Sequence, residues 1–444
     1  MPHRSAVIIA VFLSLLSPGS LRAQRSAPTA SAPVGAISKA DRERALGILD
    51  AISKGIQNLY YDPKMKGLDW NAVVSNAKVK IAESNSLNEA LTQIAVAVDT
   101  LHDSHTVFEP PTRPYHLDFG FDYQTIWSLC FVTRVRPGSD AEAKGLKPGA
   151  QVLKINGTAP NRQNLRSIEY LDYVLNPRPE MNLEVQFPSG ENQKMDIKAQ
   201  MALSTDIVYR PGAGVRYDVI RQNQNVERRM RMQYVQIGDV VILKFPWFFY
   251  DADDFYILSG KIRKGKALIV DLRGNPGGAV DTLKYFIGMF FDHDVKLYDK
   301  VERKKTSPEI AKRERPIYFP GKVTVLVDSG SASAAEIFAR VIQLEKRGTV
   351  IGDRTSGSVM EATSFYFASS GVDYGAEVTF ADLIMTDGKS LEHKGVNPDE
   401  VALPQPDDLR SGRDPVLAHA AQELGVTLTP EAAGKLFPYE WPKE

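Results

Sequence analysis

Strand-like and helix-like segments alternate regularly after about residue 230, and this alternation limits the possible folds most strongly. The apolar runs "VVILKF", "KALIVDL", "KVTVLV" and "GTVIGD" read as strands, and helical patterns near 280–291 and 333–346 lie between the later ones. Strands that are apolar throughout are buried on both faces, which is typical of a parallel sheet covered by helices. The sequence therefore predicts an α/β domain over residues 204–405.

The rest of the chain has a different periodicity. Apolar residues recur at helical spacing from residue 38 to about 101, and period-two patterns take over from about residue 117. Because 444 residues exceed one ordinary domain, we expect several units. The divisions we predict are a helical region 38–115, a strand-rich region 116–203, the α/β domain 204–405 and a tail 406–444 with two short helices.

Composition excludes some classes of function. Lys+Arg and Asp+Glu both number 54, so the net charge gives no general attraction to nucleic acid or to an anionic membrane. The chain has one cysteine, Cys130, which we expect in the core, and no Cys/His spacing typical of zinc. We therefore expect neither a metal nor an organic cofactor, and no nucleic-acid partner.

The N-terminus has the pattern of a secretory signal. His3 and Arg4 precede the apolar run "AVIIAVFLSLL", and Ala23 offers a small residue before a cleavage point. We interpret residues 1–23 as a signal peptide and 24–37 as a flexible leader. No later segment approaches the ~20 apolar residues of a membrane span. The expected location is periplasmic or secreted.

The stretch "DSGSASAAEIFARVIQ" follows a predicted strand and starts a predicted helix. Ser333 would then lie at a helix N-terminus, where free N–H groups and the helix dipole favour a developing negative charge. The same position also suits a helix cap. This stretch alone leaves both roles open for its serines.

A second loop, "DLRGNPGG", also follows a buried strand. Gly277 and Gly278 would let a ligand approach the backbone closely. A phosphate cradle is one possibility, although neither common phosphate-binding glycine motif is present. If the two strands are neighbours, this loop lies beside Ser333 and can offer N–H groups to an oxyanion.

These loops, followed by "GDRTSG" and "LEHKGVNPD", resemble the C-terminal-processing (tail-specific) serine peptidase family in order and spacing over roughly residues 40–402. The resemblance implies a crotonase-like α/β protease core with an inserted PDZ domain at 116–203 and an N-terminal helical region. It also implies that Ser333 is the nucleophile. The family's third serine in this motif is Ala335 here.

The family's usual general base is missing. Ser358 occupies the position of the lysine in the G-x-x-T-x-G-K-G pattern. The tricorn-like branch, which this chain resembles in "DSHT", implies instead His105 as base, assisted by Ser104 and Glu392. An imidazole with a pKa near ~6.5 can accept a proton at neutral pH. Taken alone, His105 is more often a hydrogen-bonded loop histidine, and Lys389 or Lys394 is an alternative base.

The PDZ interpretation depends on "FGF" and "GLKPGAQVLKING". In such domains the loop at Phe119, Gly120 and Phe121 presents N–H groups to the C-terminal carboxylate of a peptide. The aspartate usual after the second glycine of the second motif is Ala150 here. A PDZ-shaped spacer with an occluded groove is the alternative.

Together these features predict an exported serine endopeptidase that acts through an acyl-enzyme. Backbone N–H groups of Gly277 or Gly278 and of Ala334 would hold the oxyanion, and a protein or peptide would be the substrate. A catalytically inactive peptide-binding protein on a protease scaffold is the alternative, supported by the absent lysine. A crotonase-type acyl-CoA enzyme is a third possibility, which the PDZ segment and the signal peptide disfavour.

Overall fold

The computed structural model describes residues 37–111, 113, 115–203, 230–314, 317–369 and 371–441. The predicted signal peptide and almost all of the leader lie outside these residues. The N-terminal helices begin where the sequence predicts them, because Ser38 accepts a hydrogen bond from Asp41 N and Ser86 accepts one from Glu89 N. The helices are α1 (Lys39–Leu59), the 3-10 turn η1 (Met65–Gly67), α2 (Trp70–Glu83) and α3 (Leu87–Asp99).

The predicted α/β domain is confirmed as a six-stranded sheet in the order β18-β15-β14-β11-β10-β9. All neighbouring pairs are parallel except β9 and β10. The strands are β9 (Gln233–Ile237), β10 (Val240–Lys244), β11 (Ala267–Asp271), β14 (Lys322–Val327), β15 (Thr349–Gly352) and β18 (Glu400–Val401). The helices between them are α7 (Ala252–Ile262), α8 (Val280–Gly288) and α9 (Ala334–Leu344).

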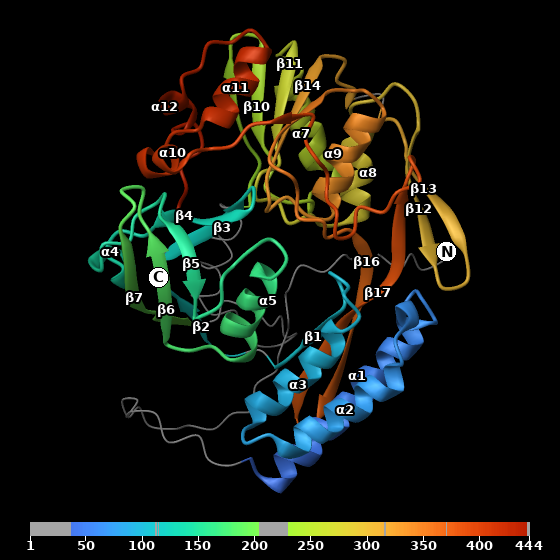
Figure 1. Ribbon diagram of the computed structural model, residues 1–444. Coiled ribbons are helices and arrows are strands. Elements are labelled where there is room, and N and C mark those ends of the chain that lie inside the picture. Colours follow the sequence, from blue (N-terminus) through green and yellow to red (C-terminus); the bar gives the residue numbers. More distant parts are fainter. Residues whose placement is uncertain are drawn as a thin grey trace, which may run out of the picture.

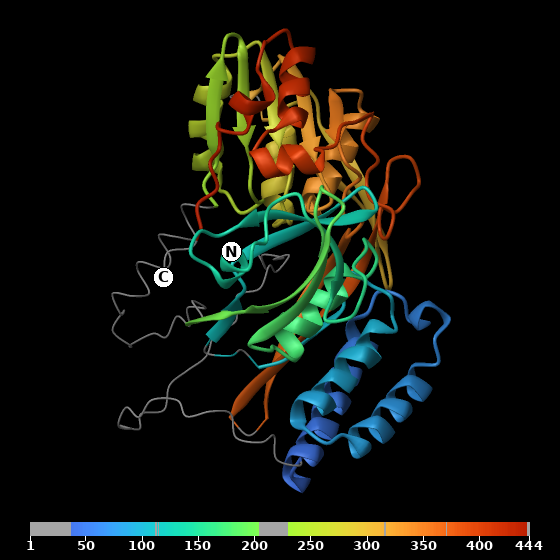
Figure 2. The ribbon, with the colours of Figure 1, turned by 60° about the vertical axis from the view of Figure 1, so that its left-hand side comes forward.

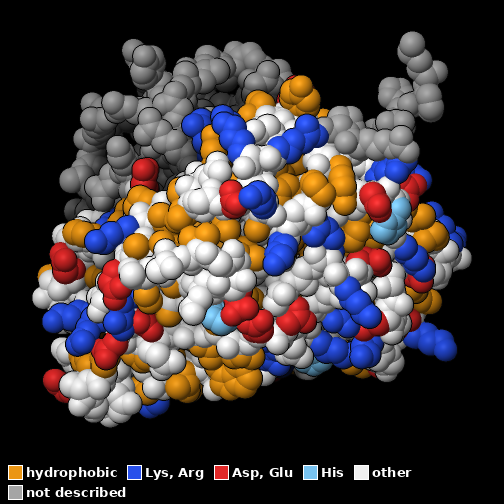
Figure 3. Space-filling model, turned by 90° about the horizontal axis from the view of Figure 1, so that it is seen from above, with side chains coloured by type: hydrophobic (Ala, Val, Ile, Leu, Met, Phe, Trp, Pro, Cys, Tyr) orange, Lys and Arg blue, Asp and Glu red, His pale blue; other side chains and the backbone are white. Residues whose placement is uncertain are grey.

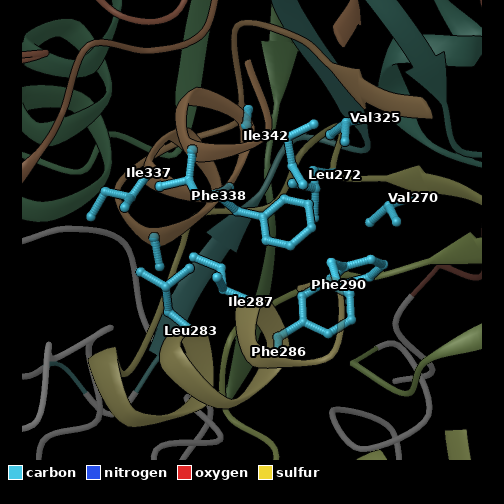
Figure 4. Packing of buried hydrophobic residues seen from close by; sticks show 14 of the residues in the cluster. Val270, Leu272, Leu283, Phe286, Ile287, Phe290, Val325, Ile337, Phe338 and Ile342 are labelled. Carbon is cyan, nitrogen blue, oxygen red and sulfur yellow. The ribbon is translucent and has the colours of Figure 1, made fainter. Parts of the chain in front are cut away.

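Both faces of this sheet are covered, which explains why its strands are apolar throughout (Figure 1). On one face, Val270, Phe286 and Phe338 belong to the largest hydrophobic cluster, and Figure 4 shows their side chains packed together. Alternate residues such as Ile269 belong to a second cluster on the other face, formed with the C-terminal tail. The α/β domain is therefore a three-layer structure.

A second sheet joins the N-terminal region to this domain, which the sequence did not predict. Strand β1 (Val107–Glu109) follows the N-terminal helices and pairs antiparallel with β17 (Val372–Met385). The sheet also contains β12 (Val295–Glu302), β13 (Thr306–Ala311) and β16 (Met360–Ser369). In Figures 1 and 2, β16 and β17 extend from the α/β domain to α1 and α3. Regions far apart in sequence thus share one sheet.

The strand-rich region forms a separate sheet in the order β3-β4-β5-β6-β7, beside the short pair β2-β8. Three helices accompany these strands, one of them the π-helix η2. The elements are β2 (Tyr115–Asp118), β3 (Phe121–Ile126), β4 (Leu129–Val135), α4 (Asp140–Ala143), β5 (Gln151–Ile155), α5 (Leu165–Glu169), η2 (Tyr170–Leu175), β6 (Glu180–Gln186), β7 (Asn192–Lys198) and β8 (Gln200–Leu203). Cys130 is buried in its core, as predicted.

The C-terminal tail forms three short helices rather than the two expected, α10 (Pro406–Ser411), α11 (Pro415–Glu423) and α12 (Pro430–Ala433). Helix α11 packs on β14 and β15. Seen from above, charged side chains of both signs are interspersed with apolar ones (Figure 3). Within the part of the chain that the structure describes, no helix is long and apolar enough to cross a bilayer.

Candidate active site

Ser333 lies at the turn from β14 into α9, as the sequence predicts. It has φ +53°, an uncommon conformation for a non-glycine residue, and is only 4% exposed. The two neighbouring serines are engaged elsewhere. Ser331 Oγ donates to Leu272 O at 2.9 Å, and Ser329 Oγ donates to Thr125 O in the strand-rich domain. Of the three candidate serines, Ser333 is therefore the one whose hydroxyl proton has no acceptor among the described residues.

The glycine loop lies directly beside Ser333, because β11 and β14 are parallel neighbours and their carboxyl ends meet. A Cβ placed on Gly277 would be 2.6 Å from Ser333 Cβ and 3.0 Å from Ala334 N. Gly277 and Gly278 have φ values of +98° and +147°, which glycine adopts readily. The approach of Ser333 explains Gly277, and a Cβ on Gly278 would lie 2.4 Å from Phe248 O.

The predicted oxyanion donors differ in availability. Gly277 N, one of the two glycine donors predicted, already donates to Asn275 Oδ1 at 2.8 Å in this conformation. Gly278 N and Ala334 N have no acceptor among the described residues. The side chain of Asn275 is fully buried and also donates to Phe245 O at 2.7 Å, which fixes the loop. Gly278 and Ala334 remain the available pair.

Ser104, His105 and Glu392 form one hydrogen-bonded chain, although Ser104 and Glu392 are 288 residues apart. Ser104 Oγ donates to Glu392 Oε2 at 2.8 Å, and Ser104 N donates to Glu392 Oε1 at 2.8 Å. Ser104 Oγ also lies 2.8 Å from His105 Nδ1. Because the hydroxyl proton is directed to the carboxylate, Nδ1 must be the donor to Ser104 Oγ. Nε2 of neutral His105 is then free to accept a proton.

Asp103 holds the loop that carries this histidine. Its carboxylate accepts from His105 N at 3.0 Å, from Thr379 Oγ1 and from Tyr60 Oη. Burial, together with the positive charge of Arg166, lowers the pKa of His105 to about 4. Burial likewise raises the pKa of Glu392. His105 is thus neutral at physiological pH and rigidly placed.

One loop connects Ser333 with the histidine chain. Ser333 N donates to Ser358 O at 2.9 Å, and the next residue, Val359, donates from its N–H to Glu392 Oε2 at 2.9 Å. Among the described residues no hydrogen bond joins Ser333 Oγ to His105. Hydrogen bonds between catalytic groups are often long without substrate and tighten when it binds.

The position of the missing lysine is occupied by a short polar side chain. Ser358 Oγ lies 3.1 Å from Ser356 Oγ. The alternative base Lys389 has a side chain that is 71% exposed and lies 3.8 Å from Asp387. Lys394 is also exposed. Neither lysine is buried beside Ser333 as His105 is buried beside Ser104 and Glu392.

The predicted carboxylate loop of the strand-rich domain is already in contact with a carboxylate of the chain itself. Gly120 N donates to Asp118 Oδ1 at 2.7 Å, and Arg136 Nη1 donates to Asp118 Oδ2 at 2.7 Å. Phe119 and Phe121 are buried in the domain core. A peptide carboxylate could therefore reach Gly120 N only by displacing Asp118.

Two residues of the site were not singled out from the sequence, namely Asn275 and Glu336. Each is a buried polar side chain that accepts hydrogen bonds from backbone N–H groups of a neighbouring loop. For Glu336 a signal exists, since an acidic residue three positions after a serine at a helix start indicates a capping arrangement. The partners of Asn275 depend on the tertiary fold.

Two family models and several known proteins are similar to this chain in sequence. Residues 237–402 match the model of peptidase family S41, and residues 119–186 match the PDZ domain. The carboxy-terminal processing protease CtpA of Bacillus subtilis is 27% identical over 265 residues, 59% of this chain and 50% of the relative. Tricorn protease homolog 2 of Streptomyces coelicolor is 24% identical over 398 residues, 84% of this chain and 31% of the relative. The chain thus spans half or less of the length of these curated relatives.

Two solved structures share the fold. Mature CPAF has a TM-score of 0.63 at 15% identity, with 84% of this chain and 95% of that chain covered. The photosystem II D1 C-terminal processing protease has a TM-score of 0.52 at 18% identity, with 88% and 99% covered. The chain thus contains a segment, residues 237–402, that matches peptidase family S41, and a PDZ domain at residues 119–186.

Proposed function

We propose that this protein is an exported serine endopeptidase in which Ser333 is the nucleophile and His105 the general base. Ser104 and Glu392 orient His105, and the N–H groups of Gly278 and Ala334 bind the oxyanion. The observation that carries the proposal is the chain Glu392–Ser104–His105, which leaves Nε2 as the acceptor on the neutral imidazole. A hydrogen-bonded base and orienting group of this kind is the general arrangement for activating a serine.

The reaction follows from these positions. Ser333 Oγ attacks the carbonyl carbon of the peptide bond while His105 Nε2 takes the hydroxyl proton. The tetrahedral oxyanion is stabilised by N–H donors that are fixed before the reaction begins. The C–N bond breaks as His105 returns the proton to the leaving amine, and an acyl-enzyme remains. Water then attacks the ester carbonyl carbon while His105 Nε2 takes a proton from it. The C–O bond to Ser333 breaks, His105 returns the proton to Ser333 Oγ, and the acid is released.

Substrate docking by the PDZ domain and export complete the proposal. The loop at Phe119, Gly120 and Phe121 would receive a peptide C-terminus once Asp118 moves away. Export is supported by the charged and apolar pattern of residues 1–23. We propose the units 38–115, 116–203, 204–405 and 406–444 as domains, although β1 and β17 pair across the first and third.

The test is covalent labelling with a fluorophosphonate, which reacts with activated serines. The wild-type protein should be labelled, and mass spectrometry should place the adduct on Ser333. Ser333→Ala should lose both labelling and peptide hydrolysis with little change in melting temperature, because only one hydroxyl is removed. An adduct on Ser329 or Ser331 would reassign the nucleophile.

The second candidate function is peptide binding without catalysis. The replacement of the family's lysine by Ser358 favours it. It predicts a folded wild-type protein that binds peptides but neither reacts with the fluorophosphonate nor cleaves any peptide in a proteome-derived library. A labelled Ser333 would exclude this candidate.

A further inference from the structure

Glu336, in the first turn of α9, is a buried carboxylate with four hydrogen-bond donors around it. Its side chain is 0% exposed. Oε1 accepts from Thr355 Oγ1 at 2.5 Å and from Gly357 N at 2.7 Å. Oε2 accepts from Ser358 N at 2.9 Å and from Ser333 N at 3.0 Å. Its lone pairs are thus fully used, and none of its hydrogen-bond partners is a charged side chain.

These contacts connect three segments that are distant in sequence. Ser333 N belongs to the nucleophile turn, whereas Gly357 N and Ser358 N belong to the loop in which the family's lysine would stand. Thr355 extends the network, because its Oγ1 also accepts from Val396 N at 2.6 Å. One carboxylate therefore fixes the nucleophile turn against the 355–358 loop and, through Thr355, against the segment that carries Glu392.

The same loop bonds to the group that orients the base. Immediately after Ser358, Val359 N donates to Glu392 Oε2, which in turn binds Ser104. Ser333 N shares its hydrogen between Glu336 Oε2 and Ser358 O, so Ser333 is joined to His105 through Glu336, the 355–359 loop and Glu392. Among the described residues Ser333 and His105 share no direct hydrogen bond, and this loop provides a hydrogen-bonded connection between them.

We propose that Glu336 is a positioning residue that sets the distance between Ser333 and His105 by bracing the 355–358 loop. This inference rests on the proposed function, because it presupposes that these two residues react together. It also gives Ser358 a role. The Ser358 side chain does not act as a base, and the backbone N–H of Ser358 binds Glu336.

The charged form of Glu336 is the one that fits the site. All four partners donate, so a protonated carboxyl would have to give up one acceptor position. Burial raises the pKa of Glu336 to about 7 despite the hydrogen bonds that favour the carboxylate. We expect kcat/KM to fall as the pH decreases through about 7, well above the pKa of His105. Folded Glu336 binds its proton more tightly than unfolded Glu336 over this range, so protonation of Glu336 does not itself destabilise the fold.

The primary variant is Glu336→Gln, which keeps the shape but replaces one acceptor oxygen with an NH2 group that faces N–H donors. We expect the fluorophosphonate labelling rate and kcat to fall about 10²-fold, because small misplacements of reacting groups have effects of that size. KM should stay within about threefold, and the acid limb near pH 7 should disappear. Asp408→Asn removes a buried carboxylate in α10 and serves as the control, with unchanged kcat.

A second pair of variants tests the same network in case Glu336→Gln does not fold. Thr355→Val removes one donor to Glu336 without changing the volume and should lower kcat about tenfold. Thr355→Ser keeps the hydroxyl and should restore most of the rate. If Glu336→Gln or Thr355→Val reacts like the wild type, or if the wild-type acid limb persists in Glu336→Gln, the positioning role is wrong.

Amide hydrogen exchange separates this inference from the proposed function. In Glu336→Gln, the amides of residues 355–359 should exchange at least tenfold faster than in the wild type, whether or not the protein is catalytic. Faster exchange in Glu336→Gln, together with a wild-type protein that never reacts with the fluorophosphonate, would refute the proposed function and leave the brace. Unchanged exchange together with normal labelling of the wild type would refute the brace alone.

Discussion

His105 has a different proton affinity in the fold from the one its residue type suggests. The sequence suggests a base with an ordinary pKa near ~6.5. Burial and Arg166 lower the pKa to about 4, so the imidazole is neutral throughout the physiological range. Because the unfolded chain binds a proton more tightly, this residue contributes stability above pH 6.5 that is lost as the pH falls toward 4.

The prediction at this scale concerns the base. His105→Gln keeps a polar side chain that cannot accept the serine proton, so kcat should fall about 10³-fold or more. Glu392→Gln should cost less, about 10- to 10³-fold, since it acts by orienting Ser104 and His105. Steady-state hydrolysis of a peptide library substrate gives both values.

His293→Gln is the matched control, because His293 lies on the surface and bonds only to Asp292 among the described residues. It should leave kcat unchanged. Near-normal turnover of His105→Gln would disprove its role as base, even if Ser333 is the nucleophile. Lys389 and Lys394 would then be tested next.

At the scale of elements, the turn between β2 and β3 decides whether the PDZ domain can bind a free C-terminus. Asp118 occupies Gly120 N and Arg136, the groups that a peptide carboxylate would use. Gly120 itself cannot be varied, because a Cβ there would lie 2.4 Å from Ser139 Cβ. Asp118 is therefore the residue to change.

Asp118→Ala should free both donors and strengthen the binding of peptides with a free C-terminal carboxylate, by about tenfold in Kd. Amidated versions of the same peptides should show no gain, because they lack the carboxylate. Fluorescence anisotropy with the full-length protein measures both. Asp122→Ala, a half-exposed acid in the same domain that pairs with Arg134, is the control. An equal gain for amidated peptides would place the docking site elsewhere.

At the scale of the whole molecule, the C-terminal tail reaches the loop beside Ser333. Arg273 Nη1 and Nη2 donate to Asp414 in the tail at 2.9 and 2.7 Å, and the same guanidinium binds Asp271. The neighbouring Gly274 belongs to the glycine loop that carries Gly278. The tail thus helps to hold the glycine loop in place.

Asp414→Asn should lower the free energy of unfolding by about 2 kcal/mol, because it removes a carboxylate partner from a mostly buried cation. It should also lower kcat, since Asp271 is then the remaining carboxylate that binds the Arg273 guanidinium. Denaturant unfolding and peptide hydrolysis measure the two effects. Asp407→Asn, in an exposed pair with Arg410, should change the free energy of unfolding by less than about 0.5 kcal/mol. Similar values for the two variants would exclude the structural role of the tail.

The sequence by itself determined those parts of the molecule that depend on neighbours along the chain. Alternating apolar runs predicted the α/β core, and serine caps predicted the starts of α1 and α3. The sequence also predicted that Ser333 lies beside the glycine loop, because the carboxyl ends of adjacent parallel strands lie at the same edge of a sheet. Ser104, His105 and Glu392 came only through the resemblance to a family.

The tertiary structure alone decided which backbone and side-chain groups are free to act. It assigned Gly277 N to Asn275, Gly120 N to Asp118, and four donors to Glu336. It also placed β1 beside β17, so that the helical region and the core form one sheet. The physical reason is that a hydrogen-bonding group can be satisfied by any partner that the fold brings within about 3 Å. Partners such as Ser104 and Glu392 are 288 residues apart, and no local pattern encodes that contact.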